Sequence, residues 1–169
     1  VSIDTMHAPV ARAAVEVGAC LVNDVSGGLA DPGMAPVVAE AGVPYVATHW
    51  RAPSREMDHH ADYRDVVADV TAELDLRVRQ LMAQGVDPAR IVLDPGLGFS
   101  KRTEHDWTLL AGLGALRELG FPLLVGASRK RFIGAALASA GAGDVPPGGR
   151  DSATAAVSAL AAAAGAFCV

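Results

Sequence analysis

The sequence predicts an α/β protein with a parallel sheet, and its details favour a (β/α)₈ barrel. Short apolar runs alternate with amphipathic, helix-like segments, which is typical of repeated βαβ units. The runs are apolar throughout, as expected of parallel strands that are covered on both faces. Polar residues close five consecutive runs, so they gather at the face where such barrels have their active sites.

Each expected strand follows a glycine that ends a helix or its loop, except the first. Glycine is common just past a helix C-terminus because it tolerates positive φ. The expected strands are 1–4, 20–23, 44–48, 90–93, 122–126 and 166–169. The expected helices are 8–17, 33–41, 62–84, 103–119 and, after an interruption, 151–164.

Polar side chains follow the strands at one end of the expected sheet. They are Asp4 and Thr5, Asn23 and Asp24, Thr48 and His49, Asp94, and Ser128 to Lys130. Helical connections return every parallel strand to the same side, so these residues meet on one face. A flavodoxin-like open sheet would bind ligands mainly at its switch point and use fewer strand ends, which favours the barrel.

The strand count indicates that residues 1–169 form a single truncated barrel domain. Six of eight strands are present, and the chain begins and ends inside strands. We therefore expect the first two βα units and the last helix to be missing. We expect this fragment to be inactive and poorly folded by itself.

Composition excludes several classes of protein. The formal net charge of −5 gives no basic footprint for nucleic acid, and no apolar stretch approaches the ~20 residues that span a bilayer. We expect Cys20 and Cys168 to be buried, reduced thiols of a cytoplasmic protein, without a signal peptide. Twelve arginines against two lysines indicate a GC-rich bacterial genome.

The segment "IVLDPGLGFSKR" places Asp94 at a strand end beside bare backbone. Its glycines fit neither GxxxxGK[ST] nor GxGxxG, and a carboxylate would repel phosphate. A carboxylate instead suits a planar heterocycle that presents adjacent N–H and NH₂ donors, since the two can form a bidentate pair. The glycines would let the ring approach, and Phe99 would pack against it. The alternative is a turn residue in Asp-Pro-Gly.

Three further segments point toward the same kind of ligand. The amide of Asn23 can read a mixed heterocycle edge, or it can open an Asx turn in "NDVSGG". Asp4 in "SIDT" can reach the ligand or cap a helix. "GASRKRFIG" concentrates Arg129, Lys130 and Arg131 at a helix start, which favours an anion or carbonyl oxygen there over a solvated basic turn.

Two other segments carry weaker signals. His49 is either a catalyst or a satisfied rim histidine. "EMDHHADY" contains Asp58, His59, His60 and Asp62, but adjacent histidines lack the i, i+4 spacing with which a helix aims two at one metal ion. We expect no metal ligands within these residues.

Taken in order, "SIDT", "NDVSGG", "DPGLGFSK" and "GASRKRF" resemble the dihydropteroate synthase family, from strand three to strand eight of its barrel. The resemblance implies a transferase of folate biosynthesis. It would condense 6-hydroxymethyl-7,8-dihydropterin diphosphate with p-aminobenzoate and release 7,8-dihydropteroate and pyrophosphate. Homodimerisation of the full-length protein stays open.

The resemblance also implies roles for individual residues. Asp94 would take the two-donor edge of the pterin, Asn23 and Asp4 would reach other ring nitrogens, and Lys130 would donate to the O4 and N5 side. Lys130 and Asp4 would be catalytic. Gly98, Phe99 and Gly126 would shape the slot for the pterin ring, and Arg129 and Arg131 would contact p-aminobenzoate. Magnesium would assist the pyrophosphate, with its ligands outside these residues.

One departure from the family pattern is Thr48, where a methionine is usual before the histidine. The family's Arg-x-His pyrophosphate clamp and its first two loops are also absent from these residues. Two alternatives therefore stay open: a methyltetrahydrofolate-dependent methyltransferase, which the basic "SRKR" disfavours, and a non-catalytic pterin-binding paralogue.

Overall fold

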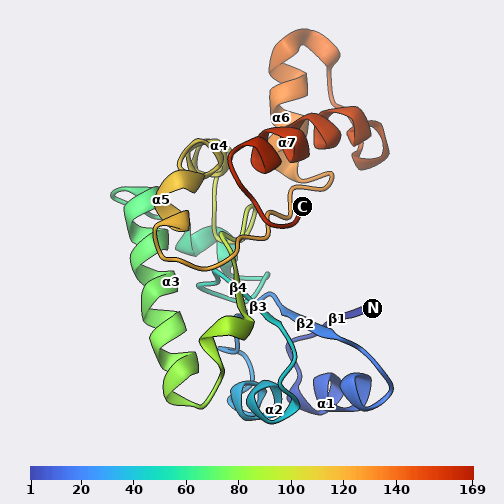
Figure 1. Ribbon diagram of the computed structural model, residues 1–169. Helices are drawn as coiled ribbons and strands as arrows, with labels where there is room; N and C mark the ends of the chain where they lie inside the picture. The colour runs from blue at the N-terminus through green and yellow to red at the C-terminus, as the bar shows by residue number, and fades with distance from the viewer.

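A computed structural model describes all residues, 1–169, as an α/β fold around a parallel sheet (Figure 1). The strands are β1 Ser2–Asp4, β2 Leu21–Asp24, β3 Tyr45–Thr48 and β4 Ile91–Asp94. The helices are α1 Ala8–Glu16, α2 Met34–Ala41, α3 Val66–Ala83, α4 Thr103–Ala111, α5 Leu113–Arg117, α6 Arg131–Leu137 and α7 Asp151–Ala163. Short helical turns are η1 Met57–His60, η2 Pro88–Arg90, η3 Ala138–Ala142 and η4 Pro147–Gly149.

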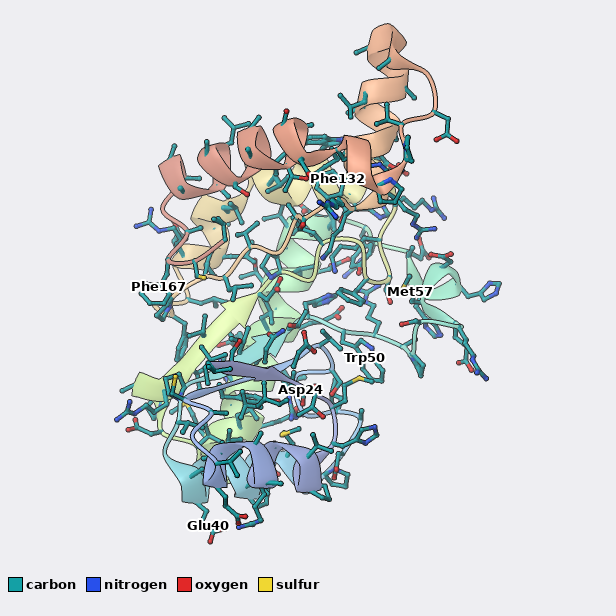
Figure 2. All side chains as sticks on the ribbon, turned by 90° about the vertical axis from the view of Figure 1, so that its right-hand side faces the viewer. Asp24, Glu40, Trp50, Met57, Phe132 and Phe167 are labelled. Atoms are coloured by element: carbon teal, nitrogen blue, oxygen red, sulfur yellow. The ribbon has the colours of Figure 1, made fainter.

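The sheet keeps the order of the chain, β1-β2-β3-β4, with every pair parallel. Its strand ends are aligned, because Asp4 pairs with Asn23 and Thr48 pairs with Asp94. Figure 2 shows Phe167 at the left of the molecule and Trp50, which follows β3, to the right of its centre. The carboxyl ends of the strands therefore share one rim, as the sequence predicts.

The last two expected strands are present only as isolated parallel bridges. Leu123 bridges to Leu93, and Cys168 bridges to Leu124, so both segments continue the order of the sheet. Pairing is short because Pro122 has no N–H to donate and can only accept a bond from Leu93. Of the six expected strands, four are therefore present as strands. The other two are extended segments that pair through a single bridge each.

The hydrophobic core lies between one face of the sheet and the helices. Tyr45, Ala47, Ile91 and Leu93 point into this core, together with Leu74 of α3. Since side chains alternate along a strand, the neighbouring residues Asn23, Thr48 and Asp94 belong to the other, inner face. In Figure 1 the helices lie around the sheet, and both chain ends lie on its right-hand side.

Helix boundaries follow local chemistry where they differ from the predicted ones. The helix expected at 62–84 starts only at Val66, because the Asp65 carboxylate caps the amides of Val67 and Ala68 at 3.0 and 3.1 Å. The helix expected at 103–119 breaks at Gly112, where a β-carbon would lie 2.6 Å from a Val67 methyl group of α3. Close packing against α3 therefore requires glycine there.

The prediction for the two cysteines is half wrong. Cys20 and Cys168 are free thiols, but both are exposed rather than buried. Cys20 lies directly before β2, where its amide donates to the Val1 carbonyl at 2.9 Å, and Cys168 lies at the isolated bridge to Leu124. Among the helices, none is both long and apolar enough to cross a membrane.

Asp24 belongs to the scaffold, although the sequence places it beside Asn23 among the rim residues. It is fully buried, and its Oδ1 accepts from the Ser26 amide at 2.8 Å and the Ser26 hydroxyl at 2.7 Å. Its Oδ2 accepts from the Gly28 amide and the Tyr45 hydroxyl, both at 2.9 Å. The carboxylate thus connects the loop after β2 to β3.

We expect Asp24→Ala to lower the free energy of unfolding by about 3 kcal/mol or more, because several buried donors lose their partner. Urea denaturation measures the loss. The matched control is Asp65→Ala, which removes an exposed helix cap and should cost about 1 kcal/mol. Equal losses for the two variants would contradict the scaffold role of Asp24.

Candidate functional site

The candidate site begins with Asp94, the last residue of β4. Asp94 is 7% exposed as a residue, and its Oδ1 accepts from the Gly96 amide at 2.7 Å. Its Oδ2 receives no hydrogen bond from the protein. Burial raises the pKa of Asp94 above its ordinary value, although Lys130, Gly96 and Lys101 act in the opposite direction. A nearly buried carboxylate with an unused oxygen is suited to a ligand that brings donors.

Gly126 and Lys130 lie next to this carboxylate. A β-carbon at Gly126 would be 3.7 Å from Asp94 Oδ2 and 3.9 Å from Lys130 Nζ, so glycine keeps both groups accessible. Burial lowers the pKa of Lys130, while Asp94 and Asp106 raise it. The ammonium group donates to the Leu97 carbonyl and has further N–H groups for a ligand.

Gly98 and Phe99 complete this side of the site. The Lys130 side chain packs against Gly98, where a β-carbon would lie 3.3 Å from Lys130 Cδ. The Lys130 Nζ is 4.9 Å from the centroid of the Phe99 ring, a cation–π contact. The structure thus brings together five predicted residues: Asp94, Gly98, Phe99, Gly126 and Lys130.

Asn23 and Asp4 form a second pair on the inner face. The Asn23 side-chain amide donates to Asp4 Oδ2 at 3.0 Å, while Asn23 Oδ1 is buried without a partner. Thr48 is paired with Asp94 in register, and its hydroxyl is also buried without a partner. Polar atoms left unsatisfied in this way mark places where a ligand or water molecule completes the hydrogen bonding.

Arg129 and Arg131, which were predicted to contact p-aminobenzoate, each form an ion pair with an aspartate. Arg129 holds Asp151 of α7 through two bonds of 2.6 and 2.9 Å, and Arg131 lies 3.1 Å from Asp58. All four side chains are at least half exposed. Asp151 raises the pKa of Arg129 through its hydrogen bond. The structure does not join these arginines to the Asp94 cluster.

Backbone strain is concentrated around the candidate site. Ser100 and Arg129 are the only non-glycine residues with positive φ, at 49° and 55°. They lie in the two loops that carry Phe99 and Lys130. Such conformations cost free energy and persist where the surroundings impose them, often at functional sites.

Sequence reasoning missed a buried polar network behind the site. Lys101 is 3% exposed and contacts His49, which in turn contacts Glu73 of α3. His49 is therefore a satisfied rim histidine, one of the two alternatives. The signal for Lys101 was its position after "GLGFS", but its partner His49 is 52 positions away along the chain.

A cavity of about 390 Å³ adjoins the loop on the side of α4 and α6. Its charged lining residues are Asp58, Lys101, Arg102, Glu104, Asp106 and Arg131. Gly98 also lines it, so the cavity adjoins the Asp94 cluster, although neither Asp94 nor Asn23 lines it. No group of three or more His, Cys, Asp or Glu side chains is arranged to hold a metal ion, including those of "EMDHHADY".

The comparison that decides the family covers the whole chain. The family model described as "Pterin binding enzyme" matches residues 1–169. The chain belongs to the pterin-binding enzyme family. The Asp94 cluster accordingly lies in a pterin-binding enzyme domain, at the strand ends where the four resembling segments meet.

Individual relatives of this pterin-binding chain are dihydropteroate synthases. It is 58% identical over 168 residues to the Mycobacterium leprae enzyme, covering 99% of this chain and 59% of that protein. It is similar to the Xanthomonas albilineans enzyme in complex with 7,8-dihydropteroate, with a TM-score of 0.87, 40% identity, and coverage of 99% and 58%. The Thermus thermophilus enzyme in complex with 4-aminobenzoate gives a TM-score of 0.89, 41% identity, and coverage of 99% and 63%. The chain thus spans about three fifths of the length of these relatives.

We expect Thr48→Val to raise the free energy of unfolding without ligand by about 1 kcal/mol, because it removes a buried hydroxyl that has no partner. Urea denaturation measures the gain. The control is Thr71→Val on α3, which should not gain stability in this way, because the Thr71 hydroxyl already donates to the Val67 carbonyl at 2.7 Å. A loss of stability in Thr48→Val would show that the hydroxyl is satisfied in solution.

Proposed function

We propose that the protein containing this chain is a dihydropteroate synthase. It would join 6-hydroxymethyl-7,8-dihydropterin diphosphate to p-aminobenzoate, giving 7,8-dihydropteroate and pyrophosphate. The observation that carries the proposal is the buried Asp94 carboxylate, which keeps Oδ2 free beside Gly126 and Lys130. The names of the similar proteins support the same reaction.

Asp94 would recognise the pterin by its pair of donors. The ring's N3–H and 2-amino group are adjacent, so one carboxylate can accept from both in a charge-assisted bidentate pair. Asp94 Oδ1 already accepts from Gly96, but a carboxylate has about four lone-pair sites and can accept more. The unpartnered Asn23 Oδ1 would accept from another ring N–H, with Asp4 orienting the Asn23 amide.

Lys130 would stabilise the reacting side of the ring. One of its N–H groups is committed to Leu97, and the others are free to donate to the pterin O4 and N5. In the reaction, the arylamine nitrogen bonds to the C6 methylene carbon, the bond to the diphosphate oxygen breaks, and the amine loses a proton. The chain's own contribution is to position the ring and stabilise the changing charge.

Arg129 and Arg131 would bind p-aminobenzoate by exchanging partners. Their ion pairs with Asp151 and Asp58 are exposed, and exposed ion pairs contribute little to stability. A substrate carboxylate can therefore replace an aspartate at small cost. The Thermus thermophilus enzyme that is similar to this chain was solved with 4-aminobenzoate bound.

The remaining expectations stay predictions. Six extended segments in chain order are consistent with part of a (β/α)₈ barrel, which we propose as the complete fold. These residues provide no ligand set for magnesium, so we assign no step to it and expect its ligands elsewhere. Cytoplasmic location is proposed from the two reduced cysteines, and bacterial origin from the excess of arginine over lysine. Homodimerisation of the full-length protein stays open.

We expect Asp94→Asn in the protein at its natural length to weaken pterin binding by about 100-fold, because it removes a buried charge-assisted pair. Binding of p-aminobenzoate should change far less. Calorimetry with each substrate separates the two effects. Unchanged pterin affinity would remove Asp94 from the site.

The pH dependence gives an independent check. Since burial raises the pKa of Asp94, its carboxylate is protonated at a higher pH than an exposed one. Pterin affinity should fall as the pH is lowered toward that raised pKa, and Asp94→Asn should lack this fall. An acid limb that is equally steep in both proteins would assign it to another group.

A further inference from the structure

The loop between β4 and α4, residues 95–101, is held by side chains rather than by a strand ladder. Gly96, Gly98 and Ser100 all have positive φ, at 68°, 76° and 49°. The Gly96 and Gly98 amides donate to Asp94 and Asp106 at 2.7 and 2.8 Å. Because the backbone of this loop makes few bonds to other backbone, its conformation depends on such side chains.

Two lysines hold the carbonyls around Phe99 from opposite sides. Lys130 donates to the Leu97 carbonyl from within the candidate site. Lys101 donates to the Phe99 carbonyl at 3.0 Å from behind the loop. Lys101 is 3% exposed, so its ammonium group needs the polar partners that the fold provides.

The second partner of Lys101 is His49. Lys101 Nζ lies 2.8 Å from His49 Nδ1, and His49 Nε2 lies 2.8 Å from Glu73 Oε2. Burial lowers the pKa of His49 to about 4, so its ring is neutral near pH 7. Since Nδ1 then accepts from Lys101, the proton is on Nε2 and is donated to Glu73.

The same network also contacts the loop of residues 95–101 through Arg51 and Tyr63. Arg51 donates to Glu73 through Nε at 3.0 Å, and its guanidinium lies 3.8 Å from the centroid of the Tyr63 ring. The Tyr63 hydroxyl donates to the Ser100 carbonyl at 3.0 Å. The carbonyls of Phe99 and Ser100 are therefore held by the two ends of one network. In Figure 2 the segment of Trp50 and Met57, which carries Arg51, lies on the right-hand side.

We propose that Lys101 is a positioning residue of the pterin site, acting through the Phe99 carbonyl to hold the Phe99 ring and the Gly98 backbone for the bound pterin. This inference rests on the proposed function. It assigns a role to a buried amine that has no direct contact with Asp94 and that the reaction itself does not use.

Several charged groups face Lys101 and determine its titration. They are Asp94 on β4, Asp106 on α4, Lys130 before α6, and His49, Arg51 and Tyr63 in the segments that follow β3. Desolvation outweighs the carboxylates and lowers the pKa of Lys101 to about 7. Above that pH the amine keeps two N–H groups but loses the strength of charge-assisted bonds.

The test measures the dissociation constant of pterin by calorimetry with the protein at its natural length. Lys101→Met should bind about tenfold more weakly at about pH 6.5, since it loses two charge-assisted bonds. The wild-type protein should lose affinity between about pH 6.5 and 8.5, as Lys101 deprotonates, and Lys101→Met should not. The control is Arg102→Met, an exposed neighbour that should bind like the wild type.

A double-mutant cycle separates positioning from general loss of structure. If Lys101 acts through Phe99, adding Lys101→Met to Phe99→Ala should cost less than about twofold, because coupled residues are non-additive. Equal binding by wild type and Lys101→Met with the same pH profile would overturn the proposal, as would full additivity with Phe99→Ala. Absence of pterin binding in the wild type would instead overturn the proposed function.

A second variant serves if Lys101→Met does not fold. Tyr63→Phe removes only the hydroxyl that holds the Ser100 carbonyl. It should weaken pterin binding about threefold, the effect of losing one neutral hydrogen bond. Unchanged affinity in folded Tyr63→Phe would then overturn the proposal, since the loop would not depend on its network.

Discussion

The parallel register of β1 to β4 is the constraint on which the site depends. It aligns Asp4 with Asn23, and Thr48 with Asp94, at one rim. A slip by one residue would reverse which side chains face the core, because strand side chains alternate. The neighbours Asn23 and Asp24 illustrate this: the first has an unpartnered oxygen on the inner face, and the second is fully satisfied beneath the helices. Asp24 therefore belongs to the scaffold, whereas Asn23 would contact the ligand under the proposed function.

The loop of residues 95–101 forms one wall of the candidate site beside Asp94. Its positive φ values and its carbonyls would be unfavourable without donors placed around it. Lys130 and Lys101 provide donors from the two sides, and both are themselves difficult to bury as cations. Burial lowers the pKa of both lysines and raises that of Asp94, so these groups depend on one another's charge. Under the proposed function, ligand binding and loop conformation would thus depend on the same electrostatic interactions.

Much of this arrangement was predictable from local sequence, and the rest depends on distant contacts. The glycines after helices, the apolar strands and the polar strand ends are local signals. All five glycines that precede the expected strands have positive φ: Gly18, Gly42, Gly85, Gly120 and Gly165. The parallel topology predicted that Asp94 and Lys130 lie at one rim, whereas Gly126 was added by the family resemblance. By contrast, the role of Asp24 depends on Tyr45, and that of Lys101 on His49, across 21 and 52 positions. No local pattern reports such pairs. The exposure of Cys20 and Cys168 depends on what packs against each segment in the fold, which an apolar run does not reveal.

The unsatisfied groups explain why the domain would be specific for a heterocycle. Asn23 Oδ1 and Thr48 Oγ1 are buried without partners, and Asp94 Oδ2 receives no hydrogen bond, all on the inner face. An apolar ligand would leave them unpaired, at about 1–3 kcal/mol for each group. A flat ring with N–H donors on its edge would satisfy them together, and the missing side chain of Gly126 would let it approach. The hydroxyl of Thr48 adds a polar group where the family's pattern has an apolar methionine. Under the proposed function, these unpartnered groups would make the site selective for a ligand that brings N–H donors.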